Sequence, residues 1–489
     1  MSDIPTYGNF RKPKTVGLHD GLSLGLSLAV LVISSIVILL LLRQAWSAAL
    51  AVMVVGALII GTMSFTDIHG LSIADRWMEI LMFGIAKRRG RTLYRSGPLG
   101  VIPSSATPLP GILGGSKVSE HLDSFDRTFA LVHHADKSVA VVMSVTPPGI
   151  DLIDRDQINT SVAQWGEWLA MLGNEIGVVQ ASVVIESSPD TGEALTRHIH
   201  SMNVVGASSV AHDVMNEVAA EYKVGAAQIR VWVTVTFQPS LMSSKKRTVD
   251  ELARDIGGRL TGITQQLKAA GAGAVHLMTA SHLSRAIRTA YDPAALALFE
   301  IAQSRGEQVD LAWEDAGPIA AEALWDAYRH DSGLSRTWVV SQPPQGVFYE
   351  NVLKDLLQIS ADVERKRVAI IYKPISAART GSVVEQDQNR ASNAVTVGGG
   401  NRARARREAR IAERNANEEA AGAGVEDFAI IITATTSDDE LEDVSSVIRA
   451  LASSSKLARI RVAYGAQDSA FALGLPLGVR PSSSIVKGM

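Results

Sequence analysis

The side chains that could do chemistry in this chain are few and scattered. Histidines come close together only at His133-His134 and at His198-Ile199-His200. Adjacent residues of a strand point to opposite faces, and residues two apart diverge on a helix, so neither pair predicts a metal clamp. Cysteine is absent, which excludes disulfides, thiolate zinc sites and cysteine nucleophiles. We therefore expect no metal site and no cofactor.

A glycine-rich segment and an acidic cluster are the remaining candidates for catalysis. Residues 111–117 resemble a phosphate-binding loop, but Ser116 stands between the glycine and Lys117, and Val118 follows. The acidic residues precede a predicted helix, where carboxylates favour the helix dipole. They are Asp151, Asp154 and Asp156. Nothing here requires an active site, so we predict that the protein is not an enzyme.

Two apolar stretches, residues 22–42 and 45–65, dominate the N-terminal part of the chain. Neither contains a charge, and only Arg43 and Gln44 separate them. Each has about the 20 residues that a helix needs to cross the ~30 Å core of a bilayer. The short connection forces the two helices to run antiparallel. Residues 21–66 therefore predict a two-helix transmembrane hairpin.

The charges around this hairpin predict its orientation. Basic residues precede the first stretch and follow the second, whereas the turn holds Arg43 alone. By the positive-inside tendency, both termini lie in the cytoplasm and the protein is a multi-pass protein of the inner membrane. Residues 1–20 then form a cytoplasmic arm, either against the lipid headgroups or as a disordered tail.

Residues 67–95 predict an amphipathic helix that ends in a basic cluster. Its apolar face could lie in the membrane interface with Trp77 at headgroup depth. The basic residues would be attracted to anionic lipid. They are Lys87, Arg88, Arg89 and Arg91. The alternative is a helix packed on the soluble part of the chain.

The rest of the chain predicts cytosolic α+β domains with mixed or antiparallel sheets. Strand and helix patterns alternate irregularly, and one expected helix covers residues 319–328. Residues 375–424 combine polar and Arg-rich sequence with few large apolar residues, which predicts a flexible insert. The expected divisions are a linker 96–117, a first α+β domain 118–239 and a second, helical or α+β domain 240–374. The insert 375–424 interrupts the second domain, whose C-terminal β-α-β part covers 425–480, and a tail 481–489 follows.

Composition limits the partners. The chain has 489 residues, a net charge of −3 and 46% hydrophobic residues, with a mean hydropathy of +0.13. A nucleic-acid coat needs a surplus of Lys and Arg on one face, so we expect no direct sequence-specific nucleic-acid binding. Membrane lipid is the partner that the hairpin implies.

The layout resembles two families of conjugative type IV secretion systems. The polar arm, hairpin and basic segment look like the small PrgI-type inner-membrane subunit. The soluble part is similar to the N-terminal domain of the VirB-type conjugation ATPases. The patterns that carry this second likeness are residues 336–340 before Pro343 and Pro344, 428–434, 441–451, 459–464 and 469–478.

In that ATPase family an aromatic residue and a Leu-Pro dipeptide stand just before the motor core. Phe471, Leu475 and Pro476 match this pattern, and the resemblance implies that they lie at a surface facing a partner. The motor core itself is absent here. The resemblance therefore implies an actinobacterial, conjugation-like membrane scaffold that docks a secretion ATPase in trans, together with other membrane subunits in an oligomeric complex.

Two alternatives remain at this point. An EccE-type subunit of a type VII (ESX) secretion system also carries two N-terminal spans and a cytosolic α+β domain. A membrane-tethered enzyme, such as a glycosyltransferase acting on lipid-linked substrates, would instead need a deep pocket with converging carboxylates or a metal.

Overall fold

The structure is a computed structural model that describes most of the chain. The described residues are 7–8, 24–64, 73–96, 108–149, 153–189, 208–221, 227–245, 247–307, 309–340, 347–360, 362–376, 426–437, 439–457 and 459–481, with scattered residues between 380 and 413.

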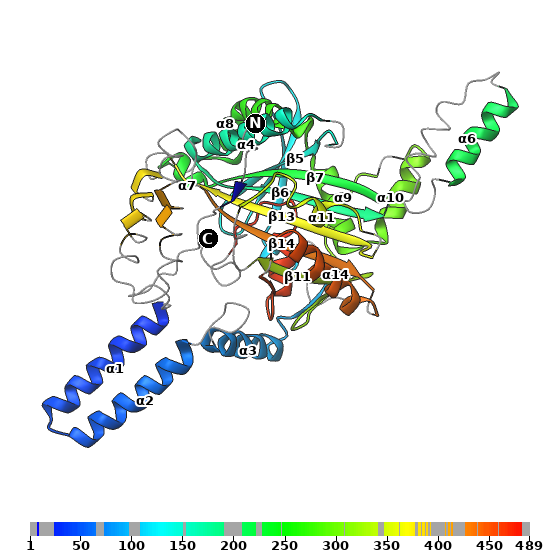
Figure 1. Cartoon of the computed structure of the whole chain (residues 1–489). Helices are drawn as coiled ribbons and strands as arrows, with labels where there is room; N and C mark the ends of the chain where they lie inside the picture. Colours follow the sequence, from blue (N-terminus) through cyan, green and yellow to red (C-terminus); the bar gives the residue numbers. More distant parts are fainter. Residues whose placement is uncertain are drawn as a thin grey trace.

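Two antiparallel helices, α1 (Leu24–Leu42) and α2 (Trp46–Ser64), project from one side of the body (Figure 1). Gly56 of α2 allows their close approach, because a Cβ atom there would lie 2.6 Å from Ile33 of α1. Side chains are described for residues 30–42 of α1 and 46–58 of α2. Within the described residues, no helix has the length and apolarity needed to cross a membrane.

The body is built on one sheet of 13 strands, and every ladder between its described strands is antiparallel. Runs of β-branched residues explain its long central strands. In spatial order the strands of the sheet are β2 (Leu93–Arg95), β9 (Ala320–Ala323), β10 (Tyr328–His330), β11 (Gly333–Val340), β14 (Glu426–Thr436), β13 (Arg365–Pro374), β6 (Val178–Pro189), β7 (Ala227–Phe237), β5 (Val139–Thr146), β4 (Thr128–His133) and β3 (Lys117–Leu122). In addition, β8 (Ala274–Leu277) pairs with β5, and β15 (Ile460–Val462) pairs with β11.

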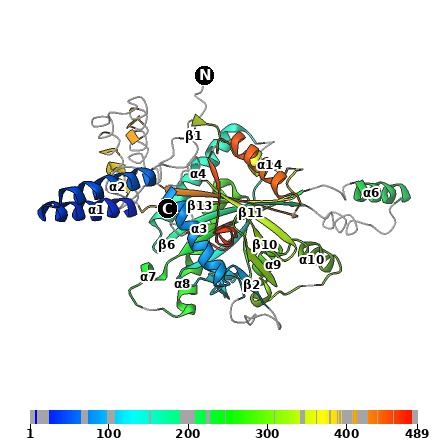
Figure 2. The ribbon, with the colours of Figure 1, turned by 90° about the horizontal axis from the view of Figure 1, so that it is seen from below.

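Helices cover both faces of this sheet (Figures 1 and 2). One face carries α4 (Arg155–Asn174) and α8 (Val249–Leu267) over one half, and α11 (Lys354–Leu357) with α14 (Leu441–Ser454) over the other. The opposite face carries α9 (Ala280–Tyr291), α15 (Gln467–Leu473) and the short helical turns η1 (Gly111–Leu113) and η3 (Trp313–Asp315). Strand alternation separates the cores: Val368 faces α14, whereas Ala369 faces the other side.

The order of elements repeats once along the chain. The first half runs β3-β4-β5, α4, β6, β7, α8, β8, α9, and the second runs β9-β10-β11, α11, β13, β14, α14, β15, α15. In both halves the short strand before the last helix pairs with the third strand of the opening meander. Across the sheet the strand order is 3-4-5-7-6 in the first half and 9-10-11-14-13 in the second. The body is thus two copies of one motif, joined where β6 meets β13.

The strand register agrees with a two-fold relation between the halves. At the junction, Val184 of β6 lies opposite Ala369 of β13, and both face the same core. Val184 pairs on its other side with Trp232, and Ala369 pairs with Ile431. The approximate axis therefore passes between β6 and β13, perpendicular to the sheet.

The structure confirms an α+β body with an antiparallel sheet and corrects one expected element. Residues 319–328 were expected as a helix but form β9 and the start of β10. Asp331 explains the difference, because its carboxylate accepts the backbone N–H groups of Ile319 and Ala320 and holds the strand in place. Tertiary pairing here overrides the helix propensity of alanine.

Two segments expected outside the body are in part attached to it. Tyr7–Gly8 of the N-terminal arm form strand β1, which pairs with β12 (Val347–Phe348). In the expected linker 96–117, Leu109 and Leu113 are fully buried. The expected boundary at residues 239 and 240 falls between β7 and α8, which belong to the same half of the repeat.

Candidate interaction surfaces

Helix α3 (Ile73–Arg88) follows the hairpin and rests on the body by one side. The ring of Phe83 packs edge-on against Trp325 with centroids 5.3 Å apart, and Arg461 lies 3.4 Å from the carboxylate of Glu79. Gly465 makes this contact possible, because it has a φ of +69° and a Cβ atom there would lie 2.8 Å from Trp325. Glu79 and Phe83 are four residues apart and so share a face.

The other side of α3 carries apolar residues that are exposed. Trp77 and Leu81 have 69% and 58% of their surface exposed. Lys87, Arg88, Arg89 and Arg91 are also exposed, directly beyond this face. The sequence-predicted interface residues are thus all exposed, with Trp77 in the first half of α3 and the basic residues at and beyond its C-terminal end. Packing on the body, the alternative left open by the sequence, is confirmed for the side of α3 that carries Phe83, whereas the interfacial role of the other side stays a prediction.

The chain contacts the body both before and after the α1–α2 hairpin. On the N-terminal side, Tyr7 pairs with Phe348 and Gly8 with Val347. On the C-terminal side, α3 contacts the body and β2 then joins the sheet beside β9. The body is therefore joined to segments on both sides of the hairpin in the sequence.

The residues expected at a partner surface lie instead in the core. Phe471 and Leu475 are 0% and 1% exposed, and Pro476 is also buried. Phe471 packs against the aromatic rings of Tyr291 and Tyr328 at 5.1 and 5.3 Å. The physical reason is apolar area: an aromatic and leucine-rich stretch is stabilised most when it covers a sheet face.

Leu475 and Pro476 belong to a C-terminal strap, defined here as residues 474–480. The strap leaves the second half and crosses the sheet of the first half. Its backbone carbonyls accept hydrogen bonds from Thr236 at Gly478 and from Gln180 at Val479, with distances of 2.9 and 3.0 Å. Gly478 has a φ of +69°, and a Cβ atom there would lie 2.4 Å from the Thr236 hydroxyl. The strap therefore locks one half to the other.

A buried ion cluster lies at the junction of the halves. Glu186 of β6 accepts hydrogen bonds from Nε and Nη2 of Arg367 on β13, at 2.9 and 2.8 Å. Nη1 atoms of Arg365 and Arg230 lie 3.5 and 3.9 Å from its other oxygen. Burial alone would raise the pKa of Glu186, but the charges of Arg367, Arg365 and Arg230 outweigh burial and hold that pKa below its ordinary value. The charges of Glu186 and of the three arginines thus interact with one another within the fold.

A buried histidine lies near this cluster. His330 contacts the backbone oxygen of Tyr291 through Nδ1 and the Ser335 hydroxyl through Nε2, at 2.5 and 2.7 Å. Burial lowers the pKa of His330 to about 4. The ring is therefore neutral at physiological pH and serves as a hydrogen-bonding core residue.

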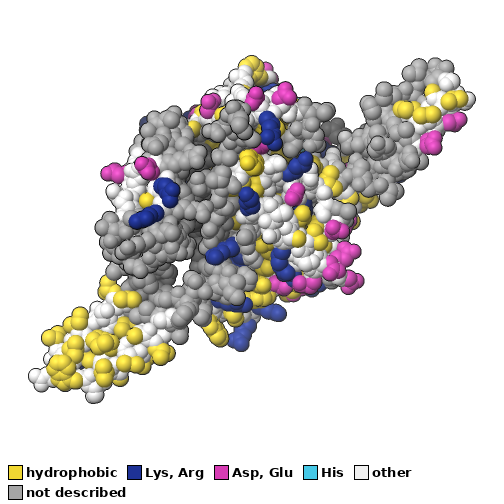
Figure 3. All heavy atoms as spheres, viewed as in Figure 1, with side chains coloured by type: hydrophobic (Ala, Val, Ile, Leu, Met, Phe, Trp, Pro, Cys, Tyr) yellow, Lys and Arg dark blue, Asp and Glu magenta, His cyan; other side chains and the backbone are white. Residues whose placement is uncertain are grey.

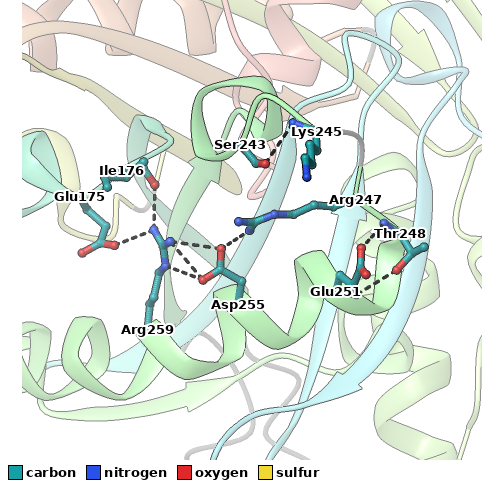
Figure 4. Close-up of polar contacts among 9 residues, drawn as sticks. All are labelled: Glu175, Ile176, Ser243, Lys245, Arg247, Thr248, Glu251, Asp255 and Arg259. Atoms are coloured by element: carbon teal, nitrogen blue, oxygen red, sulfur yellow. Dashed lines mark hydrogen bonds and ion pairs between the residues drawn. The ribbon is translucent and has the colours of Figure 1, made fainter.

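A polar network fastens the N-terminal half of α8 (Figure 4). Asp255 binds both Arg247 and Arg259, and Arg259 continues to the carboxylate of Glu175 and the carbonyl of Ile176, both at 2.8 Å. The network links α8 to the turn between α4 and β6. Its side chains are partly exposed, so we assign it a structural role.

The weaker catalytic candidates have structural roles where they are described. Residues 111–117 form the turn η1 and the start of β3, and no helix follows to bind a phosphate. His134 contacts the carbonyl of Leu477 in the strap at 2.9 Å, and His133 contacts Ser119. Asp154 and Asp156 lie at the start of α4. Asp151, His198 and His200 lie outside the described residues.

In the described ranges, no group of three or more His, Asp or Glu side chains is placed to hold a metal ion. The comparisons with protein families and with curated proteins give no match for this chain.

Proposed function

We propose that this protein is a membrane-anchored, non-enzymatic platform of a conjugation-like or type IV-like secretion apparatus, which docks a separately encoded ATPase. The observation that carries the proposal is that segments before and after the hairpin both contact the body. A flexible tether would leave a cytosolic domain free to rotate. Two attachments instead keep the body close to the hairpin from both sides of the sequence.

The bilayer anchor is inferred from the sequence of the hairpin, since part of its side chains lies outside the described residues. Its two 19-residue helices contain no charged residue. Large apolar side chains cover its described outer surface, including Leu31, Leu39 and Leu58, each more than half exposed (Figure 3). Exposing such a continuous apolar surface to water is unfavourable, and lipid is the environment that matches it.

Helix α3 then sets the depth of the body. With Phe83 held on Trp325, the exposed face containing Trp77 and Leu81 is available to the membrane interface. The exposed basic cluster that follows fits anionic headgroups.

Docking of the ATPase rests on the resemblance of the soluble part to the domain that precedes the motor in VirB-type ATPases. Since Phe471 and Leu475 are core residues, they support this proposal through the fold that they stabilise and do not themselves supply the docking surface. The joined halves present a broad, rigid sheet on which a separate motor could assemble.

Affinity purification of the full-length protein from detergent-solubilised native membranes tests the proposal. We expect a motor ATPase and further membrane subunits to co-purify, and the isolated chain to have no ATPase activity. Recovery of the protein in the soluble fraction without detergent, or ATP hydrolysis by the isolated chain, would contradict the proposal.

A further inference from the structure

The two halves of the repeat each carry a long excursion at the same place. In the first half it connects β6 to β7, and in the second it connects β13 to β14. Because β6 and β13 are antiparallel neighbours, the two excursions leave from opposite ends of the sheet. Figure 1 shows helix α6 (Ser209–Glu221) beyond one end, and the described parts of residues 380–413, in yellow and orange, beyond the other.

Helix α6 stands away from the body in both views and has an exposed acidic and apolar face (Figures 1 to 3). Asp213 and Glu217 are exposed and four residues apart, so they lie side by side. Val210 and Val214 continue the same face, with 68% and 51% of their surface exposed. The helix has three acidic residues and no Lys or Arg.

The second excursion carries the opposite charge with the same spacing. Arg406 and Arg410 are helical, exposed and four residues apart. The sequence from 402 to 410 contains five arginines and one glutamate. Glu413, also exposed, reduces this positive charge but does not cancel it.

From these observations we propose that α6 of one copy of this chain binds the Arg406–Arg410 segment of a second copy. Asp213 and Glu217 of α6 are acidic and four residues apart, and Arg406 and Arg410 are basic with the same separation in the sequence. The position of the two excursions at opposite ends of one rigid sheet favours contact between copies. Each copy offers one acidic and one basic end, so the contact is head-to-tail and builds a ring or a filament.

This proposal does not depend on the membrane or secretion assignment, and charge reversal tests it. The full-length protein in detergent is studied by light scattering at low and high salt. We expect the wild type to associate and high salt to weaken association. Asp213→Lys with Glu217→Lys, and separately Arg406→Glu with Arg410→Glu, should each weaken it about tenfold or more.

Mixing these two variants should restore association, because each then meets its complement on the other chain. The matched control is Asp439→Lys with Asp443→Lys, an exposed acidic pair of the same spacing on the body, which should leave association unchanged. A monomeric wild type, or variants that associate like the wild type, would overturn the proposal. So would a mixture that stays dissociated.

Absence of native cysteine allows a direct second test. Asp213→Cys and Arg410→Cys are made in separate preparations, mixed and oxidised. We expect a disulfide between the two different chains, and failure of that pair to cross-link while the unmodified chain associates would overturn the proposed contact.

Discussion

We expect substitution of Glu186 to destabilise the fold strongly, because its carboxylate pairs with the buried arginines Arg365 and Arg367. Its carboxylate and the Arg367 guanidinium are 4% and 2% exposed. Replacing one partner of a buried pair leaves the other charge uncompensated, which costs about 3 to 5 kcal/mol. We therefore expect Glu186→Gln to lower the free energy of unfolding by about that amount in urea titrations at neutral pH.

Glu442 supplies the control for that experiment. It pairs with Arg336 at 2.8 Å, but its side chain is 76% exposed. Arg336 is buried, but it keeps its ion pair with Asp326 when Glu442 is replaced. The exposed Glu442 therefore contributes about 1 kcal/mol or less, and Glu442→Gln should be nearly neutral. Equal effects of the two substitutions would show that the cluster at the junction is not the stabilising feature described here.

The same carboxylate predicts an acid-sensitive contribution to stability. The pKa of Glu186 in the folded chain is below its ordinary value of 4.5. Its contribution is therefore complete above the ordinary pKa and is lost as the pH falls through the folded pKa. The stability gap between wild type and Glu186→Gln should narrow on acidification, as measured by urea titrations at stepped pH. A gap independent of pH would contradict this assignment.

Gly478 sets the course of the strap through its backbone. Alanine there would need a left-handed φ and would place its Cβ atom 2.4 Å from the Thr236 hydroxyl. We expect Gly478→Ala to destabilise the protein by about 1 to 3 kcal/mol and to expose the strap to proteolysis. Gly262→Ala is the control, because nothing lies within 4 Å of a Cβ atom there. Unchanged unfolding of Gly478→Ala would contradict the strap's role.

At the scale of elements, we propose separate roles for the two faces of α3. Phe83→Ala removes the contact with Trp325, so hydrogen exchange in α3 should speed up even without lipid. Trp77→Ala, or Arg88→Glu with Arg89→Glu, should leave exchange without lipid unchanged. These variants should instead weaken the protection of residues 71–91 that vesicles with anionic lipid provide, the charge-reversal pair by about 1 kcal/mol or more per charge. Unchanged lipid protection in them would exclude the interfacial role.

Elements with a clear periodic pattern could be predicted from the sequence, and those defined by distant partners could not. The strand at 428–434 and the helix at 441–451 follow from β-branched residues and from a regular apolar face. The strand at Ala320–Ala323 exists because β2, β10 and the carboxylate of Asp331 hold it. Alanine alone favours a helix, so no local pattern identifies this strand.

The candidate surfaces divide in the same way. Lys87 to Arg91 are exposed in the structure, since a run of charges rarely becomes buried. Phe471 and Leu475 illustrate the opposite case, because apolar residues near a chain end can equally serve a partner or the core. Distant partners decide between the two: Tyr291 and Tyr328 pack on Phe471, and Thr236 and Gln180 position the strap that contains Leu475.

At the scale of the whole molecule, the repeat explains why strands from both expected domains join one sheet. Each half has an open side, and the pairing of β6 with β13 closes both. The sequence shows no obvious similarity between the halves, so register and strand order were needed to find the repeat. The repeat also places the two charged excursions at opposite ends of the sheet.

The central proposal is that residues 21–66 form a transmembrane hairpin that holds the body on the cytoplasmic side of a membrane. Because the chain has no cysteine, a single introduced thiol reports its own side of the membrane. We predict that Gln44→Cys, in the turn between α1 and α2, reacts with a membrane-impermeant maleimide added to intact cells or right-side-out vesicles. Ser454→Cys, at the end of α14, should react only after the membrane is opened. Protection of Gln44→Cys from outside, or labelling of Ser454→Cys without opening the membrane, would contradict the account.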